Sequence, residues 1–283
     1  MPQPLPLPAP PSLRPHEAFE TVLPSAGLPS AGLPAAGDTD PAPPGPGAWL
    51  LTCEHASRRI PRPLRSTAAD RPWLATHWGY DIGARAVVRT LARRWAAPAV
   101  LARFSRLVVD ANREPDHPDL VRGEVEGHAL SFNRDLTGAE VGRRLATLHA
   151  PYHAEVDRLL AQLRAAGRAP LLLSVHSFTP AWEGRARPME VGVLFDEHDD
   201  LAEEAARRLE AEGFVTARNA PYSGKAGLIY APQRHGRMHT VPYLELELNQ
   251  ALIAAPAAAR AVAVRVARAL GPLSGCAPCT RPG

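Results

Sequence analysis

The chain of 283 residues has only three cysteines and lacks any long uninterrupted apolar run. A helix that crosses a bilayer needs about 20 predominantly apolar residues, so no membrane span is expected. The start of the chain also lacks a basic segment followed by an unbroken apolar one, which excludes a typical signal peptide. These absences predict a cytoplasmic protein without a membrane partner.

The cysteines and the net charge indicate no further partner. Cys276 and Cys279 form a Cys-x-x-Cys pair, but no second pair completes a structural zinc site, and no neighbouring base marks Cys53 as a nucleophile. The net charge is +3, and Arg supplies nearly all of the positive charge. Much of that Arg is interleaved with Glu, Asp and Ala, as on solvated helix faces. Because no basic stripe contains interleaved aromatic residues, we expect no nucleic-acid partner.

Composition divides the chain into three parts. Residues 2–46 are dominated by Pro, Ala, Gly and Leu, and Leu-Pro-Ser-Ala-Gly-like repeats occupy 23–37. Such a segment has few groups to bury and many prolines that disfavour helices and sheets. We therefore predict a disordered leader (1–46), one folded domain (47–272) and a flexible tail (273–283).

The folded part alternates apolar runs with amphipathic stretches rich in Ala, Arg and Leu, a pattern typical of an α/β domain. Strands are predicted at 48–53, 98–103, 106–110, 170–175, 190–195, 214–217 and 241–248. Helices are predicted at 80–96, 138–165, 199–212 and 255–270, with Thr137 as an N-cap and Pro151 dividing the second helix. The segments 114–135 and 218–240 are predicted to be long loops.

Two histidines follow apolar runs of predicted strands. His55 comes after residues 49–53, and His176 ends the run that begins at Pro170. Ligands of open α/β sheets bind beyond the carboxyl ends of the strands, so these two imidazoles can bind one metal ion. The alternative is that each caps its strand through a hydrogen bond to backbone.

A hydrolytic zinc ion usually has three protein ligands and one water. Glu54 and Asp81 are both candidates for the third ligand. Neighbours in a strand point to opposite faces, so Glu54 can join His55 only if the chain already turns there. Asp81 is preferred, although a carboxylate at a helix start is also stabilised by the helix dipole.

Polar residues follow another predicted strand end. Asp110 is followed by Asn112 and Arg113, and Arg is suited to bidentate recognition of a substrate carboxylate. Arg106 offers a second guanidinium. The alternative is that Arg113 pairs with Asp110 or Glu114 and fixes the loop.

Glu245 and Glu247 lie on one face of a predicted strand whose other face is Leu. A buried carboxylate beside a metal suits a general base that deprotonates water. An edge strand with a solvent-facing polar side has the same alternation. The alternation alone therefore does not distinguish a catalytic base from an exposed glutamate.

Six motifs occur in the order typical of one enzyme family: Cys53-Glu-His-Ala-Ser, His77-Trp-Gly-Tyr-Asp-Ile-Gly-Ala, Ser105-Arg-Leu-Val-Val-Asp-Ala-Asn-Arg, Pro151-Tyr-His, Ser174-Val-His-Ser-Phe-Thr-Pro and Leu246-Glu-Leu-Asn-Gln. Over about 48–270 the chain resembles the N-formylglutamate amidohydrolases. The resemblance implies a three-layer α/β/α sandwich around a mixed, mostly parallel sheet, as in zinc carboxypeptidases and aspartoacylases. It also implies hydrolysis of N-formyl-L-glutamate, or a related N-acyl amino acid, to the free amino acid.

The resemblance implies roles for particular residues. His55 and His176 correspond to ligands of one Zn²⁺ ion, Asn112 and Arg113 to the pair that holds the substrate carboxylate, and Glu247 to the general base. Arg106 is assigned to the stabilisation of the oxyanion. Asn133 and Arg134 form another polar motif of the family, grouped with substrate binding without a defined role.

One position departs from carboxypeptidase-type enzymes, which place a ligand Glu three residues after the first His. Here that position is Arg58, so Glu54 and Asp81 both remain candidates. The Glu-His-Ala-Ser and His-Ser-Phe-Thr-Pro variants of the motifs suggest a divergent branch of the family. We expect a monomer or homodimer that acts on a small acidic molecule. Two other readings stay open: a non-catalytic protein that binds an acidic ligand, and a zinc deacylase or peptidase on the same scaffold.

Overall fold

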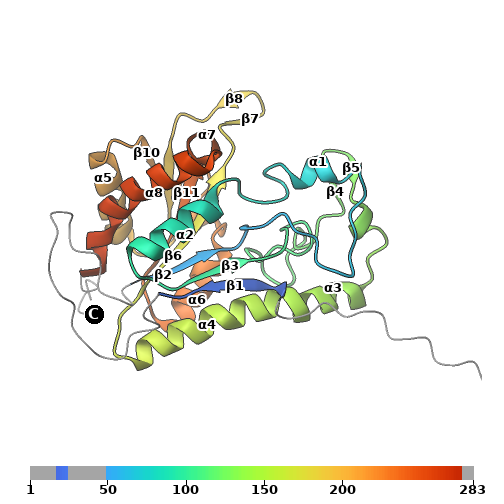
Figure 1. Cartoon of the computed structure of the whole chain (residues 1–283), viewed down its shortest axis with the longest axis horizontal. Coiled ribbons are helices and arrows are strands. Elements are labelled where there is room, and N and C mark those ends of the chain that lie inside the picture. Colours follow the sequence, from blue (N-terminus) through green and yellow to red (C-terminus); the bar gives the residue numbers. More distant parts are fainter. Residues whose placement is uncertain (1–16, 25–48, 276–283) are drawn as a thin grey trace, which may run out of the picture.

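A seven-stranded sheet forms the centre of the protein (Figure 1). The computed structural model describes residues 17–24 and 49–275. The strands of the sheet are β1 (Phe19–Val22), β2 (Trp49–Cys53), β3 (Ala99–Ala102), β6 (Leu171–Phe178), β9 (Val191–Leu194), β10 (Thr216–Arg218) and β11 (Tyr243–Asn249). Their spatial order is β1-β3-β2-β6-β11-β9-β10.

The sheet is mixed and mostly parallel, as predicted. The neighbours β3, β2, β6 and β11 all run parallel, and β9 runs parallel to β10. The pairs β1–β3 and β11–β9 are antiparallel. The carboxyl ends of β2, β6 and β11 therefore meet at the same edge of the sheet.

Helices cover both faces of the sheet, which confirms the three-layer α/β/α architecture. The helices are α1 (Arg71–Leu74), α2 (Ala84–Arg94), α3 (Gly138–Arg144), α4 (Ala150–Ala165), α5 (Asp199–Ala211), α6 (Tyr230–His239), α7 (Gln250–Ile253) and α8 (Pro256–Leu270). The helices α2, α5 and α8 share one apolar core with the sheet, whereas α4 belongs to a second core on the other face (Figure 1). The helix α6 packs beside α4.

The spacing of apolar residues along each element explains which side chains pack into each core. In α2, Ala84, Val87, Val88 and Leu91 are buried and recur at the three- and four-residue spacing of one helix face. The strand β11 alternates instead, and its leucines pack into the core beneath α2 and α8. Its glutamates consequently face the opposite side of the sheet. Since β11 lies between β6 and β9, it is a central strand and not an edge.

The predicted strand at 106–110 is wrong. The chain turns there, with the Val108 amide donating to the Ser105 carbonyl at 2.9 Å. The apolar residues Leu107, Val108 and Val109 are buried in the core on the α4 side. An apolar run predicts burial, and here a turn buries it without any ladder hydrogen bonds.

The predicted loops contain regular structure. The helix α6 occupies part of 218–240, although Pro232 and Gly236 have low helix propensity. Its packing needs that glycine, because a Cβ at Gly236 would lie 2.0 Å from the Tyr243 ring. The segment 114–135 contains the short strands β4 (Glu124–Val125) and β5 (His128–Ala129) and the 3₁₀ helix Ser131–Asn133.

The long helix predicted at 138–165 is interrupted as expected, but before Pro151. A π-helical segment, Leu145–His149, joins α3 to α4, and Pro151 lies in the first turn of α4, where a missing N–H costs little. The Thr137 hydroxyl accepts a hydrogen bond from the Glu140 amide, which confirms the predicted N-cap.

The leader is not wholly disordered, because Phe19–Val22 forms β1 and pairs with β3 at the sheet edge. This short segment differs from its proline-rich surroundings in having aromatic and β-branched residues, which suit a strand. Cys276, Cys279 and most of the predicted tail lie outside the described residues. No helix among the described residues is both long enough and apolar enough to cross a membrane.

One glycine of β9 tests the packing of the sheet. A Cβ at Gly192 would lie 2.2 Å from the Ala220 carbonyl oxygen, so Gly192→Ala should lower the free energy of unfolding by about 1–3 kcal/mol. Gly142 is the matched control, since it is exposed in α3 and has nothing within 4 Å. Gly142→Ala should leave stability unchanged or raise it by up to about 1 kcal/mol. Urea denaturation measures both, and equal effects would contradict this packing.

Candidate active site

One cavity of about 340 Å³ lies at the carboxyl ends of β2, β6 and β11. His55 follows β2, and His176 lies in the second half of β6. Glu247 of β11 is the register partner of His176, because the two strands run parallel and adjacent. Asp81 lies in the loop before α2, where its amide donates to the His55 carbonyl at 2.9 Å. The topology thus brings these four residues into one cavity.

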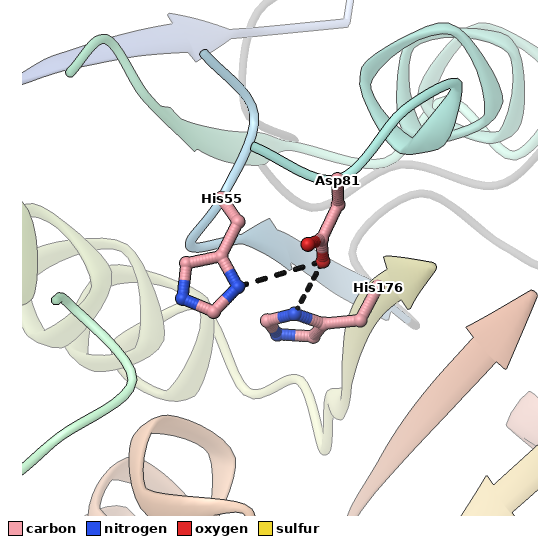
Figure 2. A group of neighbouring side chains, drawn as sticks. All are labelled: His55, Asp81 and His176. Carbon is pink, nitrogen blue, oxygen red and sulfur yellow. Dashed lines mark hydrogen bonds and ion pairs between the residues drawn. The ribbon is translucent and has the colours of Figure 1, made fainter. Parts of the chain in front are cut away.

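Asp81 lies between the two imidazoles (Figure 2). Its Oδ2 atom is 2.8 Å from His176 Nδ1 and 3.5 Å from His55 Nδ1. The ring centroids are 4.7 Å apart, and the rings are tilted by 76°. All three side chains are buried, and their nearest donor atoms lie within 4.8 Å of one another. This is the spacing of a group that surrounds one ion.

The other nitrogen of each ring contacts a second carboxylate. His55 Nε2 is 2.7 Å from Asp110 Oδ1, and His176 Nε2 is 2.9 Å from Glu54 Oε2. With Nε2 of each ring held by a carboxylate, Nδ1 of each ring faces Asp81 and can bind an ion there once it is deprotonated. Carboxylates that hold the outer nitrogen of a histidine in this way are typical of metal ligands.

The group fits a divalent metal ion. His55 Nδ1 is buried and has no hydrogen-bond partner among the described residues, and a buried polar atom of this kind costs free energy unless it is paired. Two imidazoles and one carboxylate form a typical catalytic zinc site, which keeps a position for water. Burial disfavours a charged His176, but Glu245 and Asp81 outweigh burial and raise the pKa of His176 well above its ordinary value. The site therefore attracts positive charge.

Glu54 is held away from this group. Tyr152 and Ser174 donate hydrogen bonds to its carboxylate at 2.8 and 2.6 Å, while His176 contacts it through Nε2. Burial alone would raise the pKa of Glu54, but these hydrogen bonds outweigh burial and lower it to about 2. Of the two candidate carboxylates, the structure brings Asp81 to both histidines and places Glu54 behind one of them.

Two glutamates of β11 face the same cavity. Glu245 Oε2 lies 3.6 Å from His176 Nε2, and burial raises the pKa of Glu245 to about 7. Burial also raises the pKa of Glu247 well above its ordinary value. Glu247 Oε2 has no hydrogen-bond partner among the residues that the structure describes. A buried carboxylate in this position can accept a proton and return it.

Arg106 and Asn112 line the cavity but are largely engaged with the protein. Arg106 Nε and Nη2 donate to Asp110 Oδ2 at 3.1 and 2.8 Å. Asn112 donates to Glu245 at 3.3 Å, and its Oδ1 accepts from the Ala231 amide at 2.9 Å. The loop-fixing role therefore applies to both side chains.

Arg113 also lines the cavity. Its Nη1 contacts the Asn112 carbonyl at 3.4 Å, and the His149 ring holds the Arg113 carbonyl at 3.0 Å. No ion pair of Arg113 occurs among the described residues, so the alternative of a pair with Asp110 or Glu114 is not formed. Its charge remains available to a ligand.

Asn133 and Arg134 do not line the cavity. Asn133 Nδ2 donates to the carbonyls of Leu107 and Arg122 at 2.7 and 2.6 Å, and its Oδ1 accepts from buried Arg144 at 2.6 Å. Arg134 is exposed. Asn133 thus joins separate loop segments, and its placement gives no support to substrate binding by either residue.

Several cavity residues were not singled out from the sequence. Trp182 lies in a hairpin of β7 (Ala181–Trp182) and β8 (Arg185–Ala186), and Arg187 follows it directly. The two-residue strands of this hairpin are too short for a periodic signal. Tyr152 lies outside the cavity lining and donates a hydrogen bond to Glu54. It was visible within the Pro151-Tyr-His motif, but nothing in the sequence connects it to Glu54.

A second group, His176 with Glu245 and Glu247, also has donor atoms close enough to hold an ion. The metal content of two variants distinguishes this group from His55, Asp81 and His176. Asp81→Ala removes the carboxylate between the imidazoles, so the purified variant should lose most of its divalent metal. Glu247→Gln should keep the wild-type content. Elemental analysis by mass spectrometry measures both, and the reverse result would place the ion on the second group.

Comparisons with known proteins agree with the fold. The family model of the N-formylglutamate amidohydrolases matches residues 47–254, and no protein of curated function matches the sequence. A solved gene product of Agrobacterium tumefaciens is 34% identical with a TM-score of 0.73, covering 80% of this chain and 92% of that one.

The N-formylglutamate amidohydrolase of Ralstonia eutropha JMP134 is 17% identical with a TM-score of 0.60, covering 91% of this chain and 97% of its own. This second likeness is one of fold. The family model spans well over half of the chain. The chain therefore belongs to the N-formylglutamate amidohydrolase family.

Proposed function

We propose that this protein is a metal-dependent amidohydrolase that removes the N-formyl group from an N-formyl amino acid. The best candidate reaction converts N-formyl-L-glutamate to formate and L-glutamate. One observation carries the proposal: the His55–Asp81–His176 group, which fits a divalent ion, shares a cavity with the buried carboxylate of Glu247. Family membership supports a hydrolase that acts on N-acyl amino acids.

The residues of the cavity suit the steps of amide hydrolysis. His55, Asp81 and His176 would hold a divalent ion such as Zn²⁺, which would supply the Lewis acid that acidifies water and polarises the formyl carbonyl. Glu247 accepts the proton of the attacking water and returns it to the amide nitrogen of the leaving amino acid. Its burial supports this role, because a raised pKa lets the carboxyl group hold the proton between the two steps.

Positive charge on the cavity wall suits an acidic substrate. The arginines that line the cavity are Arg106, Arg113, Arg122 and Arg187. We assign Arg113 to a substrate carboxylate, because its guanidinium forms no ion pair within the described part of the chain and a planar fork binds carboxylates at two points. Arg106 remains paired with Asp110, and its Nη1 lies 3.9 Å from Asp81. From there it can offset negative charge that develops on the formyl oxygen.

Formate release tests the reaction and the general base. The purified, metal-loaded protein should release formate from N-formyl-L-glutamate. Glu247→Gln keeps the shape but cannot accept a proton, so kcat should fall by about 10²–10⁴-fold with metal content unchanged. Stoichiometric metal without hydrolysis of any N-acyl amino acid would favour a binding protein instead. A panel of N-formyl, N-acetyl and peptide substrates would identify a deacylase or peptidase.

Arg113→Met tests the carboxylate contact. The substitution keeps most of the side-chain length and removes the charge, so KM for N-formyl-L-glutamate should rise by about 10–100-fold, with a smaller change in kcat. Steady-state kinetics measures both parameters. Arg134→Met is the control, because Arg134 is exposed and outside the cavity. Equal effects of the two substitutions would contradict the assignment.

A further inference from the structure

Arg187 lies directly after the β7–β8 hairpin and lines the cavity. Its Nη1 donates to Thr179 Oγ1 at 3.1 Å and lies 3.5 Å from the Tyr222 hydroxyl. The guanidinium carbon is 5.3 Å from the centroid of the Tyr222 ring, and lies 5.6 and 5.7 Å from those of Trp182 and Phe178. The aromatic rings and Thr179 therefore fix the orientation of the guanidinium.

These neighbours hold the charge without neutralising it. Arg106 is paired with Asp110, and Arg122 is paired with Asp119 at 3.0 Å. Within residues 17–24 and 49–275, Arg187 has neither an ion pair nor a hydrogen bond from Nε or Nη2. Aromatic rings carry no formal charge, so cation–π contacts leave the net charge in place. The cavity consequently contains two guanidinium groups without a carboxylate partner, those of Arg113 and Arg187.

The free edge of Arg187 suits a carboxylate. With Nη1 engaged by Thr179, Nε and Nη2 remain, and these two donors together match the two oxygens of one carboxylate. Arg187 is half-buried and lies beside the buried ring of Phe178, so an electrostatic contact with a bound anion is screened less than in open solvent. Aromatic packing has already fixed the side chain, so binding costs little side-chain entropy.

We propose that Arg187 determines specificity by binding one of the two carboxylates of a dicarboxylic N-formyl amino acid, while Arg113 binds the other. This inference rests on the proposed function and assigns a cation to each acidic group of the substrate. A monocarboxylic substrate would leave one of the two guanidinium groups without a partner. The protein should therefore prefer N-formyl-L-glutamate to substrates in which one carboxylate is an amide.

Three substrates of almost the same shape test the inference: N-formyl-L-glutamate, N-formyl-L-glutamine and N-formyl-L-isoglutamine. The last two each replace one carboxylate with an amide. Arg187→Met should lower kcat/KM for N-formyl-L-glutamate by about 10–100-fold. For one of the two amides it should change kcat/KM by less than about threefold, because that substrate lacks the carboxylate that Arg187 binds. That amide also identifies which carboxylate Arg187 contacts.

Two further variants serve as references. Arg187→Lys keeps the charge but loses the planar fork, so it should show the same pattern with a smaller loss. Arg185 lies in the β7–β8 hairpin, is exposed and does not line the cavity, so Arg185→Met should behave like the wild type. Thermal midpoints and metal contents establish that each variant is folded. If Arg187→Met does not fold, the changes in kcat/KM of Arg187→Lys across the three substrates test the inference instead.

An equal loss on all three substrates would overturn the inference, because it would indicate that Arg187 only supports the hairpin. Unchanged kinetics would overturn it as well. A wild-type protein that releases no formate from any of the three is a different outcome: it contradicts the proposed function itself and the inference with it.

Discussion

The contact of Asp81 with two buried imidazoles is the interaction on which the rest of the site depends. Each imidazole is also held at its outer nitrogen, by Asp110 or by Glu54. Buried carboxylates are costly unless a cation or hydrogen-bond donors compensate them. At this end of the cavity, Glu247 Oε2 has no hydrogen-bond partner among the described residues, and burial raises the pKa values of both Glu245 and Glu247. The inner end therefore favours a cation, whereas Arg113 and Arg187 favour an anion elsewhere on the wall.

The sheet supplies this arrangement without unusual backbone geometry at His55, Asp81 or His176. Because β2 and β6 are adjacent and parallel, the residues at their carboxyl ends lie close together. The parallel pairing of β6 with β11 places Glu247 beside His176. Asp81 is fixed by its own amide, which donates to the His55 carbonyl, and by the Ser177 amide, which donates to Asp81 Oδ2 at 3.2 Å. Asp81 is thus held by the backbone as well as by the two histidines.

Much of this fold could be predicted from hydrophobic patterns, since strands and helices bury faces of different period. The order of the motifs also predicted the family. The choice between Glu54 and Asp81 could not be made from the sequence, because it depends on Tyr152 and Ser174, which come from distant elements. Burial alone did not distinguish a strand from a turn at 106–110. The strand β1 was not predicted, because the proline-rich composition of the surrounding residues indicated disorder.

The placement of polar loop residues was the least predictable part. Asn133 has hydrogen-bonding partners from three separate segments, so its structural role is not visible locally. Arg187 follows a hairpin too short to give a periodic pattern. The aromatic rings around its guanidinium come from β6, β7 and the loop at Tyr222. Long-range side-chain contacts of this kind leave no signal in composition or spacing.

The most direct test of the central claim is anomalous diffraction at the absorption edge of the bound metal, on crystals of the metal-loaded protein. We predict one strong peak about 2.0–2.2 Å from His55 Nδ1, His176 Nδ1 and an Asp81 oxygen. A peak on Glu245 and Glu247 instead, or crystals of active protein without a peak at Asp81, would contradict it.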